Sequence, residues 1–262
     1  MMARLLPYIS IVVLLLVMCM AAQPGTGRTP DDEGQDLSGV LPPSLVKLPY
    51  LKTIDFTRNY LSGNIPREWA STKLEYLSII VNNLSGPIPS FLGNITTLVY
   101  MSLESNLFSG TVPPELGNLV NLVNLILNAN NLTGDLPFAL TKLTKLTELR
   151  ISSNNFTGKM PEFFRSWIHL EKLEIQASGF EGPIPSSISI LSNLTELDLS
   201  FNRLVGEVPD LVGLTDLEFV LNRLEPAFRL EYRRAKYLTS NLLTGSISSW
   251  ITGSVNRKWY GF

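Results

Sequence analysis

The hydrophobic and polar residues of this chain follow one pattern that recurs about every 24 residues. A clear copy runs from Leu143 to Pro161 and reads L-x-x-L-x-x-L-x-L-x-x-N-x-L-x-G-x-[ILVM]-P, where L is any large apolar residue. Apolar residues on a helix recur near every 3.6 positions, without a Gly and a Pro in each copy, so the pattern does not fit leucine-rich helices. The Asn position can be followed through eight copies, in one of which Ser replaces it: Asn59, Asn82, Asn106, Asn130, Asn154, Ser178, Asn202 and Asn241.

Each copy predicts one coil of a solenoid, because a short repeat cannot bury its apolar face alone and is stabilised by stacking on its neighbours. The L-x-L segment predicts a short strand whose two apolar side chains point into the core, while the residues beside them point outward onto a concave face. The Asn turns the chain, and its amide is expected to form a ladder between coils, with each hydrogen bond worth about 0.5–1.5 kcal/mol. The Gly permits a backbone shape that other residues resist, and the Pro excludes a helix.

The segment after the Asn, L-x-G-x-[IV]-P, resembles the plant-specific variety of leucine-rich repeat. Over roughly Leu37 to Trp250 the chain resembles the extracellular region of a plant leucine-rich-repeat receptor-like kinase, and the runs Thr57–Gly63 and Leu197–Leu204 resemble the branch that carries a malectin-like domain. The resemblance implies a leucine-rich-repeat solenoid of α/β-type architecture, a curved right-handed stack of coils with a parallel β-sheet on the concave face and irregular or 3-10 turns on the convex face. It also implies a secretory route and perception at the cell surface, but it names no ligand.

The other segments are interpreted around a repeat domain at residues 37–250, with about eight full repeats after a partial first coil. Met1–Ala22 is interpreted as a secretory signal peptide, because a basic residue precedes an apolar run that ends in small residues; a retained signal anchor is the alternative. Residues 23–36 are rich in Gly, Pro and acidic residues and are expected to be disordered. Residues 251–262 are expected to form an irregular tail. No later stretch is apolar enough for a membrane span, so none is expected in the mature chain.

The repeat frame breaks once, at an insert of residues 221–236 in the last repeat. Removing Leu221–Lys236 joins Val220 to Tyr237 and restores the register, with Asn241 at the ladder position. Three interpretations stay open: a functional loop that holds a ligand, a tolerated loop without a role, or sequence that arose from imperfect splicing. We favour the last, because the insert interrupts a core strand rather than a variable loop.

Composition and charge exclude several kinds of chemistry. Hydrophobic residues make up 45% of the chain and charged residues 17%, which suits a core running its full length, and a net charge of −2 gives no electrostatic case for nucleic acid. His169 is the only histidine, and Cys19, within the signal, is the only cysteine, so the mature chain has no disulfide and no metal-ligand set. The kinase signatures H-R-D and D-F-G are absent. We therefore predict no enzymatic activity, no catalytic residues, no cofactor and no metal.

Five N-x-[ST] sequons agree with secretion and are the glycosylation candidates: Asn83, Asn94, Asn131, Asn155 and Asn193. Three of them, at Asn83, Asn131 and Asn155, arise with the repeat consensus, whereas Asn94 and Asn193 lie on the outer, variable part and are the better candidates. The predicted location is the secretory pathway and then the extracellular space or cell wall, or the plasma membrane if a longer product exists.

The concave face is the predicted binding surface, since eight strands about 4.8 Å apart form a sheet roughly 35–40 Å wide. An aromatic and aliphatic group lies toward its N-terminal half: Tyr76, Ile80, Val81 and Tyr100. A charged group lies toward its C-terminal half: Glu148, Arg150, Lys172, Glu174, Glu196 and Asp198. The alternative for both groups is ordinary strand surface. The candidate partner-binding residues are Tyr76, Ile80, Tyr100, Glu104, Asn128, Arg150, Glu174 and Asp198.

These features predict a non-catalytic extracellular recognition module, an ectodomain-like fragment of a receptor-like kinase. Its expected partner is a peptide or protein bound on the concave face, and a co-receptor is a further candidate partner. One alternative is a soluble secreted inhibitor or decoy of the type that binds microbial wall-degrading enzymes. Another is a non-functional product of a truncated gene, which the interrupted strand and the lack of a cysteine-paired cap favour.

Overall fold

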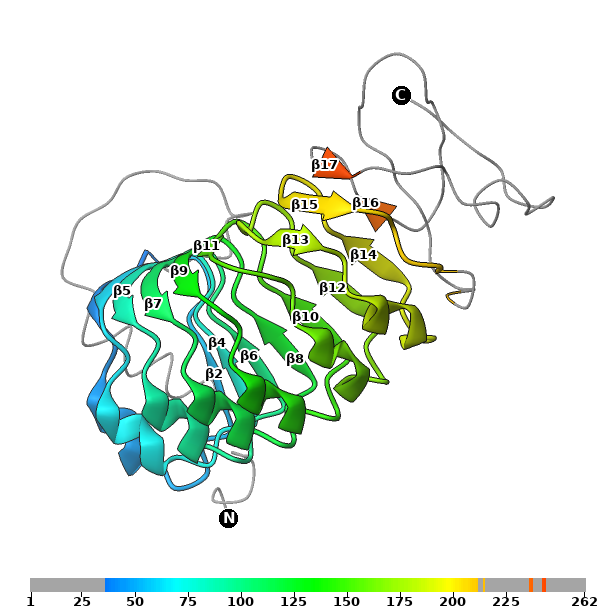
Figure 1. Cartoon of the computed structure of the whole chain (residues 1–262). Coiled ribbons are helices and arrows are strands. Elements are labelled where there is room, and N and C mark those ends of the chain that lie inside the picture. Colours follow the sequence, from blue (N-terminus) through cyan, green and yellow to red (C-terminus); the bar gives the residue numbers. More distant parts are fainter. Residues whose placement is uncertain (1–35, 212–213, 215–235, 238–241, 244–262) are drawn as a thin grey trace.

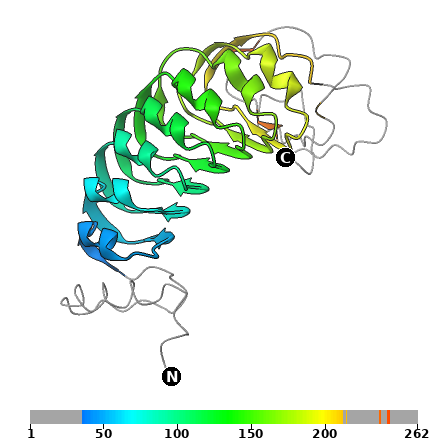
Figure 2. The ribbon, with the colours of Figure 1, turned by 90° about the horizontal axis from the view of Figure 1, so that it is seen from below.

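The computed structural model describes residues 36–211, 214, 236–237 and 242–243 as a curved solenoid (Figures 1 and 2). One strand of each coil joins a parallel sheet with the order β16-β14-β12-β10-β8-β6-β4-β2. This sheet lines the inner side of the arc, so the predicted concave sheet and solenoid fold are confirmed. Its strands are β2 (Thr53–Asp55), β4 (Tyr76–Ser78), β6 (Tyr100–Ser102), β8 (Asn124–Ile126), β10 (Glu148–Arg150), β12 (Lys172–Glu174), β14 (Glu196–Asp198) and β16 (Lys236–Tyr237).

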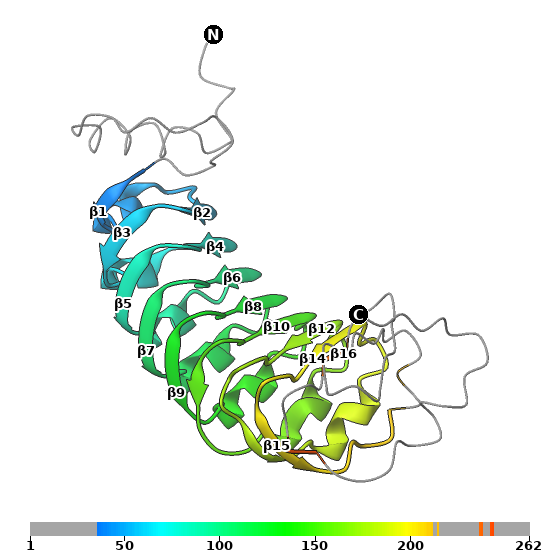
Figure 3. The same cartoon turned by 90° about the horizontal axis from the view of Figure 1, so that it is seen from above.

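A second set of strands follows the ladder position of each coil, which the sequence analysis did not anticipate (Figure 3). One sheet has the order β1-β3-β5-β7-β9-β11 and another the order β13-β15-β17, and a bridge between Lys159 and Glu181 joins the two. The strands are β1 (Ser38–Val40), β3 (Tyr60–Gly63), β5 (Asn83–Pro87), β7 (Leu107–Thr111), β9 (Asn131–Gly134), β11 (Asn155–Phe156), β13 (Glu181–Pro183), β15 (Arg203–Gly206) and β17 (Leu242–Leu243).

The convex side carries one short 3-10 helix per coil, as predicted (Figure 2). Each helix begins directly after a Pro in extended conformation, which is the last residue of the repeat pattern. Since Pro fixes its own backbone and has no N–H to donate, the 3-10 turn starts at the same place in every coil. The helices are η1 (Pro43–Lys47), η2 (Arg67–Ser71), η3 (Ser90–Asn94), η4 (Pro114–Asn118), η5 (Phe138–Lys142), η6 (Glu162–Ser166) and η7 (Ser186–Ile190).

The predicted Asn ladder is present. Asn106 is typical: its Oδ1 accepts the backbone N–H of Leu84 in the preceding coil at 3.1 Å, and its Nδ2 donates to the carbonyls of Ile79, Leu103 and Glu104. Ser178 takes over only part of this role, because its single hydroxyl proton is directed at the Ile151 carbonyl at 2.8 Å. The Ser178 side chain therefore makes fewer ladder hydrogen bonds than the described Asn residues at the equivalent positions.

The residue before each ladder position has a left-handed backbone. The φ values lie between 49° and 56° at Arg58, Val81, Ser105, Ala129, Ser153, Ala177 and Phe201. This conformation turns the chain from the concave strand into the second strand. It is costly for side chains other than Gly and Asn, and most costly for β-branched or bulky ones such as Val81 and Phe201. Each coil therefore stores some strain at this turn, which the ladder and the core offset.

The core is a continuous stack of apolar side chains between the sheets and the convex helices. Its largest members include Trp69 and Trp167, which are fully buried on the convex side. Each indole Nε1 donates to a backbone carbonyl of the preceding coil, at Pro42 and Leu140, with distances of 3.1 and 3.0 Å. These tryptophans thus fill the core and join neighbouring coils at the same time.

Several predicted segments lie outside the described residues: the signal peptide at 1–22, nearly all of 23–36, most of the insert at 221–236, and the tail at 251–262. The register beyond the insert is described. Tyr237 pairs with Asp198, as expected for the resumed frame, but Lys236 rather than Val220 lies at the position paired with Leu197. In the second sheet, Leu242 pairs with Val205, which continues the same frame.

Candidate recognition surface

The concave face consists of the outward side chains of β2 to β14, which form three rows because the strands are parallel and in register. The row that opens the strands is Thr53, Tyr76, Tyr100, Asn124, Glu148, Lys172 and Glu196. The middle row is Asp55, Ser78, Ser102, Ile126, Arg150, Glu174 and Asp198. The row that follows the strands is Thr57, Ile80, Glu104, Asn128, Ser152, Gln176 and Ser200. All eight candidate binding residues lie in these rows.

The two tyrosines of the candidate group stack on each other. Tyr76 and Tyr100 lie on adjacent strands with ring centroids 4.3 Å apart and an interplanar angle of 8°. Both are half-buried, and burial together with the neighbouring Tyr76 phenol raises the pKa of Tyr100 to about 12. Ile80, also half-buried, lies across the middle row from them. The sequence placed these side chains on one face, and the structure brings the two rings into contact.

A network of charged side chains is centred on Arg150. Its guanidinium contacts the Glu148 carboxylate, and its terminal nitrogen lies 3.3 Å from Glu174 Oε1. Asn128 Nδ2 donates to the other oxygen of Glu174 at 3.4 Å, and Asn124 Nδ2 donates to Glu148. The two carboxylates therefore hold Arg150 from both sides, and three candidate residues, Asn128, Arg150 and Glu174, form one unit.

Arg150 and Glu174 show how this network affects ionisation. Burial lowers the pKa of Arg150, but the carboxylates of Glu174 and Glu148 raise it by more, so the net shift is upward. Burial raises the pKa of Glu174, and the nearby Glu196 adds to this, although Arg150 acts in the opposite direction. The net pKa shift of Glu174 is upward, so the Arg150 guanidinium does not fully offset the effect of burial on this carboxyl.

Asp198 lies at the C-terminal end of the face without a cationic partner in any described ion pair. Its Oδ1 accepts the backbone N–H of Ser200 at 2.9 Å and the Ser200 hydroxyl at 2.6 Å. Burial raises the pKa of Asp198, and these hydrogen bonds reduce that effect. Next to it, Glu196 is paired with Lys172 at 3.4 Å. Glu104, the remaining acidic candidate, is half-buried in the row that follows the strands.

The sequence analysis missed the Ser102 hydroxyl. Ser102 is fully buried in the middle row, and its Oγ has no hydrogen-bond partner among the described residues. By strand alternation it belongs to the concave side, since Met101 and Leu103 on either side point into the core. The neighbouring Tyr100 phenol is the polar group nearest to it in the electrostatics of the face, since Ser102 lowers the pKa of Tyr100 in opposition to burial.

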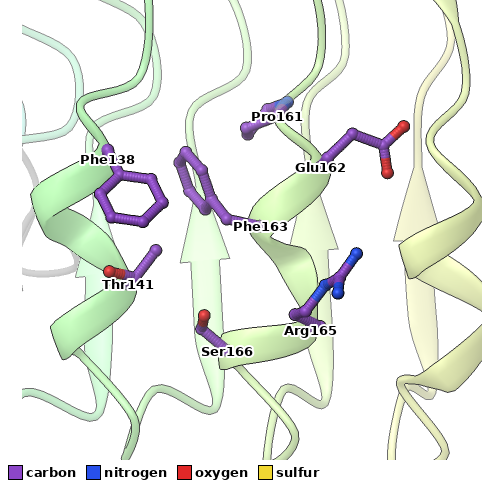
Figure 4. Close-up of a pocket in the computed structure, with 7 residues that line it drawn as sticks. All are labelled: Phe138, Thr141, Pro161, Glu162, Phe163, Arg165 and Ser166. Carbon is purple, nitrogen blue, oxygen red and sulfur yellow. The ribbon is translucent and has the colours of Figure 1, made fainter.

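The convex side has a groove between η5 and η6, which the sequence analysis also missed (Figure 4). It has a volume of about 610 Å³ and is lined by Phe138, Thr141, Pro161, Glu162, Phe163, Arg165 and Ser166. Phe163 points across the groove toward Phe138, with the rings edge to face and centroids 5.8 Å apart. The Phe138 side chain is 74% exposed.

The groove has a local cause. Thr141 lies where the two preceding coils have Gly93 and Gly117. A Cβ at either glycine would lie 2.2 Å from a backbone carbonyl oxygen of the next coil, so the glycines let those helices approach closely. Because Thr141 carries a Cβ, η6 cannot approach η5 in the same way, and the space between them stays open.

The five sequon asparagines are all exposed. Asn83, Asn131 and Asn155 each begin a strand of the second sheet, and Asn155 Nδ2 donates to Asn131 Oδ1 in the preceding coil. Asn94 ends η3, and Asn193 Nδ2 donates to the Ile168 carbonyl at 3.1 Å. Their exposure is compatible with glycans at each position and does not separate the better candidates from the others.

Within the part of the chain that the structure describes, His, Cys, Asp and Glu form no group of three or more that could hold a metal ion. The helices there are too short and too polar to cross a membrane.

Comparisons with known proteins identify the repeats. Profiles of the leucine-rich repeat match residues 144–204, 73–95 and 97–119. A probable LRR receptor-like serine/threonine-protein kinase of Arabidopsis thaliana is 46% identical over 66 residues, which are 25% of this chain and 6% of that protein. The matches to such kinases fall in their repeats and include no catalytic domain. The chain thus contains leucine-rich repeats, and these are related to the repeats of plant receptor kinases.

Solved structures of plant receptor ectodomains have the same fold as this chain. The ectodomain of the Arabidopsis thaliana receptor kinase GASSHO1/SCHENGEN3, in complex with CASPARIAN STRIP INTEGRITY FACTOR 2, has a TM-score of 0.73 and 35% identity, over 84% of this chain and 25% of that chain. The Arabidopsis receptor kinase HAESA, in complex with the peptide hormone IDA and the co-receptor SERK1, has a TM-score of 0.74 and 26% identity, over 88% of this chain and 38% of that chain. The chain therefore has the fold of a plant receptor ectodomain but spans well under half of either.

Proposed function

We propose that this chain is a receptor-like recognition module that binds a peptide or protein on its concave face. The observation that carries the proposal is the concentration of half-buried tyrosines and a charged network on the outward side of one parallel sheet. Stacked aromatic rings and a partly buried Arg are side chains that dominate binding energy at interfaces. The receptor ectodomains with the same fold, one in complex with a peptide hormone, support this assignment.

The proposal is tested by selecting displayed random decapeptides on the full chain and measuring their dissociation constants. Replacing Tyr76 and Tyr100 together by Ala is expected to weaken binding at least tenfold, since aromatic anchors are common hot spots. The matched control is Tyr60→Ala, which removes a tyrosine that is 52% exposed on the second sheet, away from the concave face. Equal loss of affinity in both variants, or no loss in either, would contradict the proposal.

We also propose that the chain enters the secretory pathway through Met1–Ala22 and carries glycans at one or more of its five sequons. The exposure of all five asparagines supports this. Expression of the full chain in plant cells, followed by mass spectrometry before and after deglycosylation, would test it. The expected result is a secreted product without residues 1–22 that loses mass on deglycosylation. An intracellular product of unmodified mass would refute the proposal.

A co-receptor is a further proposed partner, supported by the solved HAESA complex with SERK1. It would contact the ligand-loaded chain, so its binding should depend on the selected peptide. Sedimentation of the chain with a candidate co-receptor ectodomain, with and without peptide, tests this dependence. A complex that forms equally well without peptide would argue against a ligand-dependent co-receptor.

A further inference from the structure

The concave face carries a strong excess of negative charge. Its three rows contain two basic side chains, Arg150 and Lys172. They also contain six acidic side chains: Asp55, Glu104, Glu148, Glu174, Glu196 and Asp198. The whole chain has a net charge of only −2, so the excess is a property of this face rather than of the composition.

The internal ion pairs leave this charge unbalanced. Arg150 is shared between Glu148 and Glu174, and Lys172 is taken up by Glu196. Both basic residues are therefore already engaged by carboxylates. Asp198, partly buried beside Glu196, receives hydrogen bonds only from Ser200 in the described residues. The three described rows thus have surplus carboxylates and no unpaired cation, which makes them complementary to a positively charged partner, and like charges on a partner would be repelled.

The apolar contacts of the face lie at a different place. The stacked rings of Tyr76 and Tyr100, with Ile80 nearby, occupy β4, β6 and the residues that follow β4. The face thus offers an apolar anchor at one end and most of its carboxylates at the other.

The distance between the two ends sets the length of the partner. Tyr100 is on β6 and Asp198 is on β14, and the order β6-β8-β10-β12-β14 places four strand spacings between them. At about 4.8 Å per spacing this is roughly 19 Å. An extended peptide covers about 3.3 Å per residue, so about six residues bridge the two ends.

We propose that the concave face binds an extended cationic peptide whose apolar residue lies against Tyr76 and Tyr100 and whose basic residues, about six positions away, face Glu174, Glu196 and Asp198. This inference rests on the proposed function and adds the chemical class and spacing of the ligand. It gives the two halves of the face separate roles, with apolar contact at one end and charge recognition at the other.

The test determines the amino-acid sequences of the decapeptides that are selected for binding to the full chain. The expected result is enrichment of Lys and Arg, depletion of Asp and Glu, and an apolar residue five to seven positions from the basic ones. The double variant Glu196→Gln/Asp198→Asn should weaken binding of a selected peptide at least tenfold. The control variant Glu68→Gln/Glu115→Gln removes two exposed carboxylates from η2 and η4 on the convex side and should leave the affinity unchanged.

Two peptide variants sharpen the result. Replacing the basic residues of a selected peptide by Gln should abolish the dependence of its affinity on salt concentration. Removing three residues between its apolar residue and its basic residues should weaken binding as much as removing the apolar residue or the basic residues. The selected peptides could lack enrichment in Lys and Arg and still bind less tightly to the Tyr76→Ala/Tyr100→Ala variant. That result would overturn this inference and leave the proposed function standing. Peptides whose affinity is insensitive to every concave-face variant would overturn both.

Discussion

Tyr76 and Tyr100 stack nearly parallel, with ring centroids 4.3 Å apart, although 24 positions separate them in the chain. Their strands, β4 and β6, pair in register at these two residues. The contact therefore depends on the solenoid holding neighbouring coils at fixed spacing. It is the best-defined apolar feature of the concave face.

A double-mutant cycle should show that the contact between these two rings contributes to the free energy of unfolding. The variants Tyr76→Ala and Tyr100→Ala are each expected to destabilise the chain, and the coupling free energy between them should be about 0.5–1.5 kcal/mol, the range for stacked aromatic pairs. Urea unfolding of the wild type, both single variants and the double variant measures it. A coupling near zero would mean that the stacking contributes nothing to folding.

The Asn ladder predicts that one substitution lowers the stability of the chain and that another raises it. Asn106→Ala removes four hydrogen bonds from buried groups and should cost roughly 3 kcal/mol, given about 1–3 kcal/mol for a buried group left unpaired. Ser178→Asn should stabilise the chain by about 1 kcal/mol, because an amide can donate two protons and accept a third bond where the hydroxyl donates only one. Denaturant melts of both variants test the pair. Destabilisation by Ser178→Asn would show that this coil cannot hold an Asn.

Backbone strain at Val81 gives a third prediction. Val81 is β-branched and has a φ of 54°, a conformation that Asn tolerates far better. Val81→Asn is therefore expected to raise the unfolding free energy by about 1 kcal/mol, within the range for a residue held in this region. Val99→Asn is the control, since Val99 is similarly exposed but is not among the positive-φ residues. Equal effects at both positions would exclude strain as the cause.

The glycine column on the convex side predicts losses of different size at two equivalent positions. Gly117→Ala places a Cβ 2.2 Å from the Ala139 carbonyl oxygen, so η5 must move, and a loss of about 3 kcal/mol or more is expected. Thr141→Gly, one coil later, removes the side chain that keeps η6 apart and should be tolerated much better. Thermal melts of both variants measure the difference. Similar losses at Gly117 and Thr141 would refute the account given for the groove.

Asp198 makes stability depend on pH. Burial raises its pKa above the value near 3.9 expected in an unfolded chain. A raised carboxyl pKa means that the favourable contribution is present below the unfolded pKa and is lost as pH rises through the folded pKa. Asp198→Asn keeps an oxygen for Ser200 and should therefore melt at a higher temperature than the wild type at pH 7, with the difference vanishing near pH 3. A difference that persists at pH 3 would point to a cause other than ionisation.

Much of the architecture could be predicted because each repeated position has one physical role. The Leu column, the ladder Asn and the terminal Pro specify a strand, a turn and a 3-10 helix in every coil, so the concave sheet and the ladder were predicted. The second sheet was not, because strands such as Asn83–Pro87 contain Ser, Gly and Pro, which are poor strand formers. They pair because left-handed residues such as Val81 redirect the chain alongside the preceding coil.

The sequence by itself determined which side chains lie on the concave face, since strand alternation depends only on local order. Only the tertiary structure decided which of them meet: Arg150 is held by Glu148, two positions away, and by Glu174 in the next coil, whereas Asp198 has no described ion pair. Such pairing depends on register and side-chain reach between coils, which the repeat pattern does not specify. The groove beside Thr141 has the same origin, because a single Cβ sets how closely one coil approaches the next.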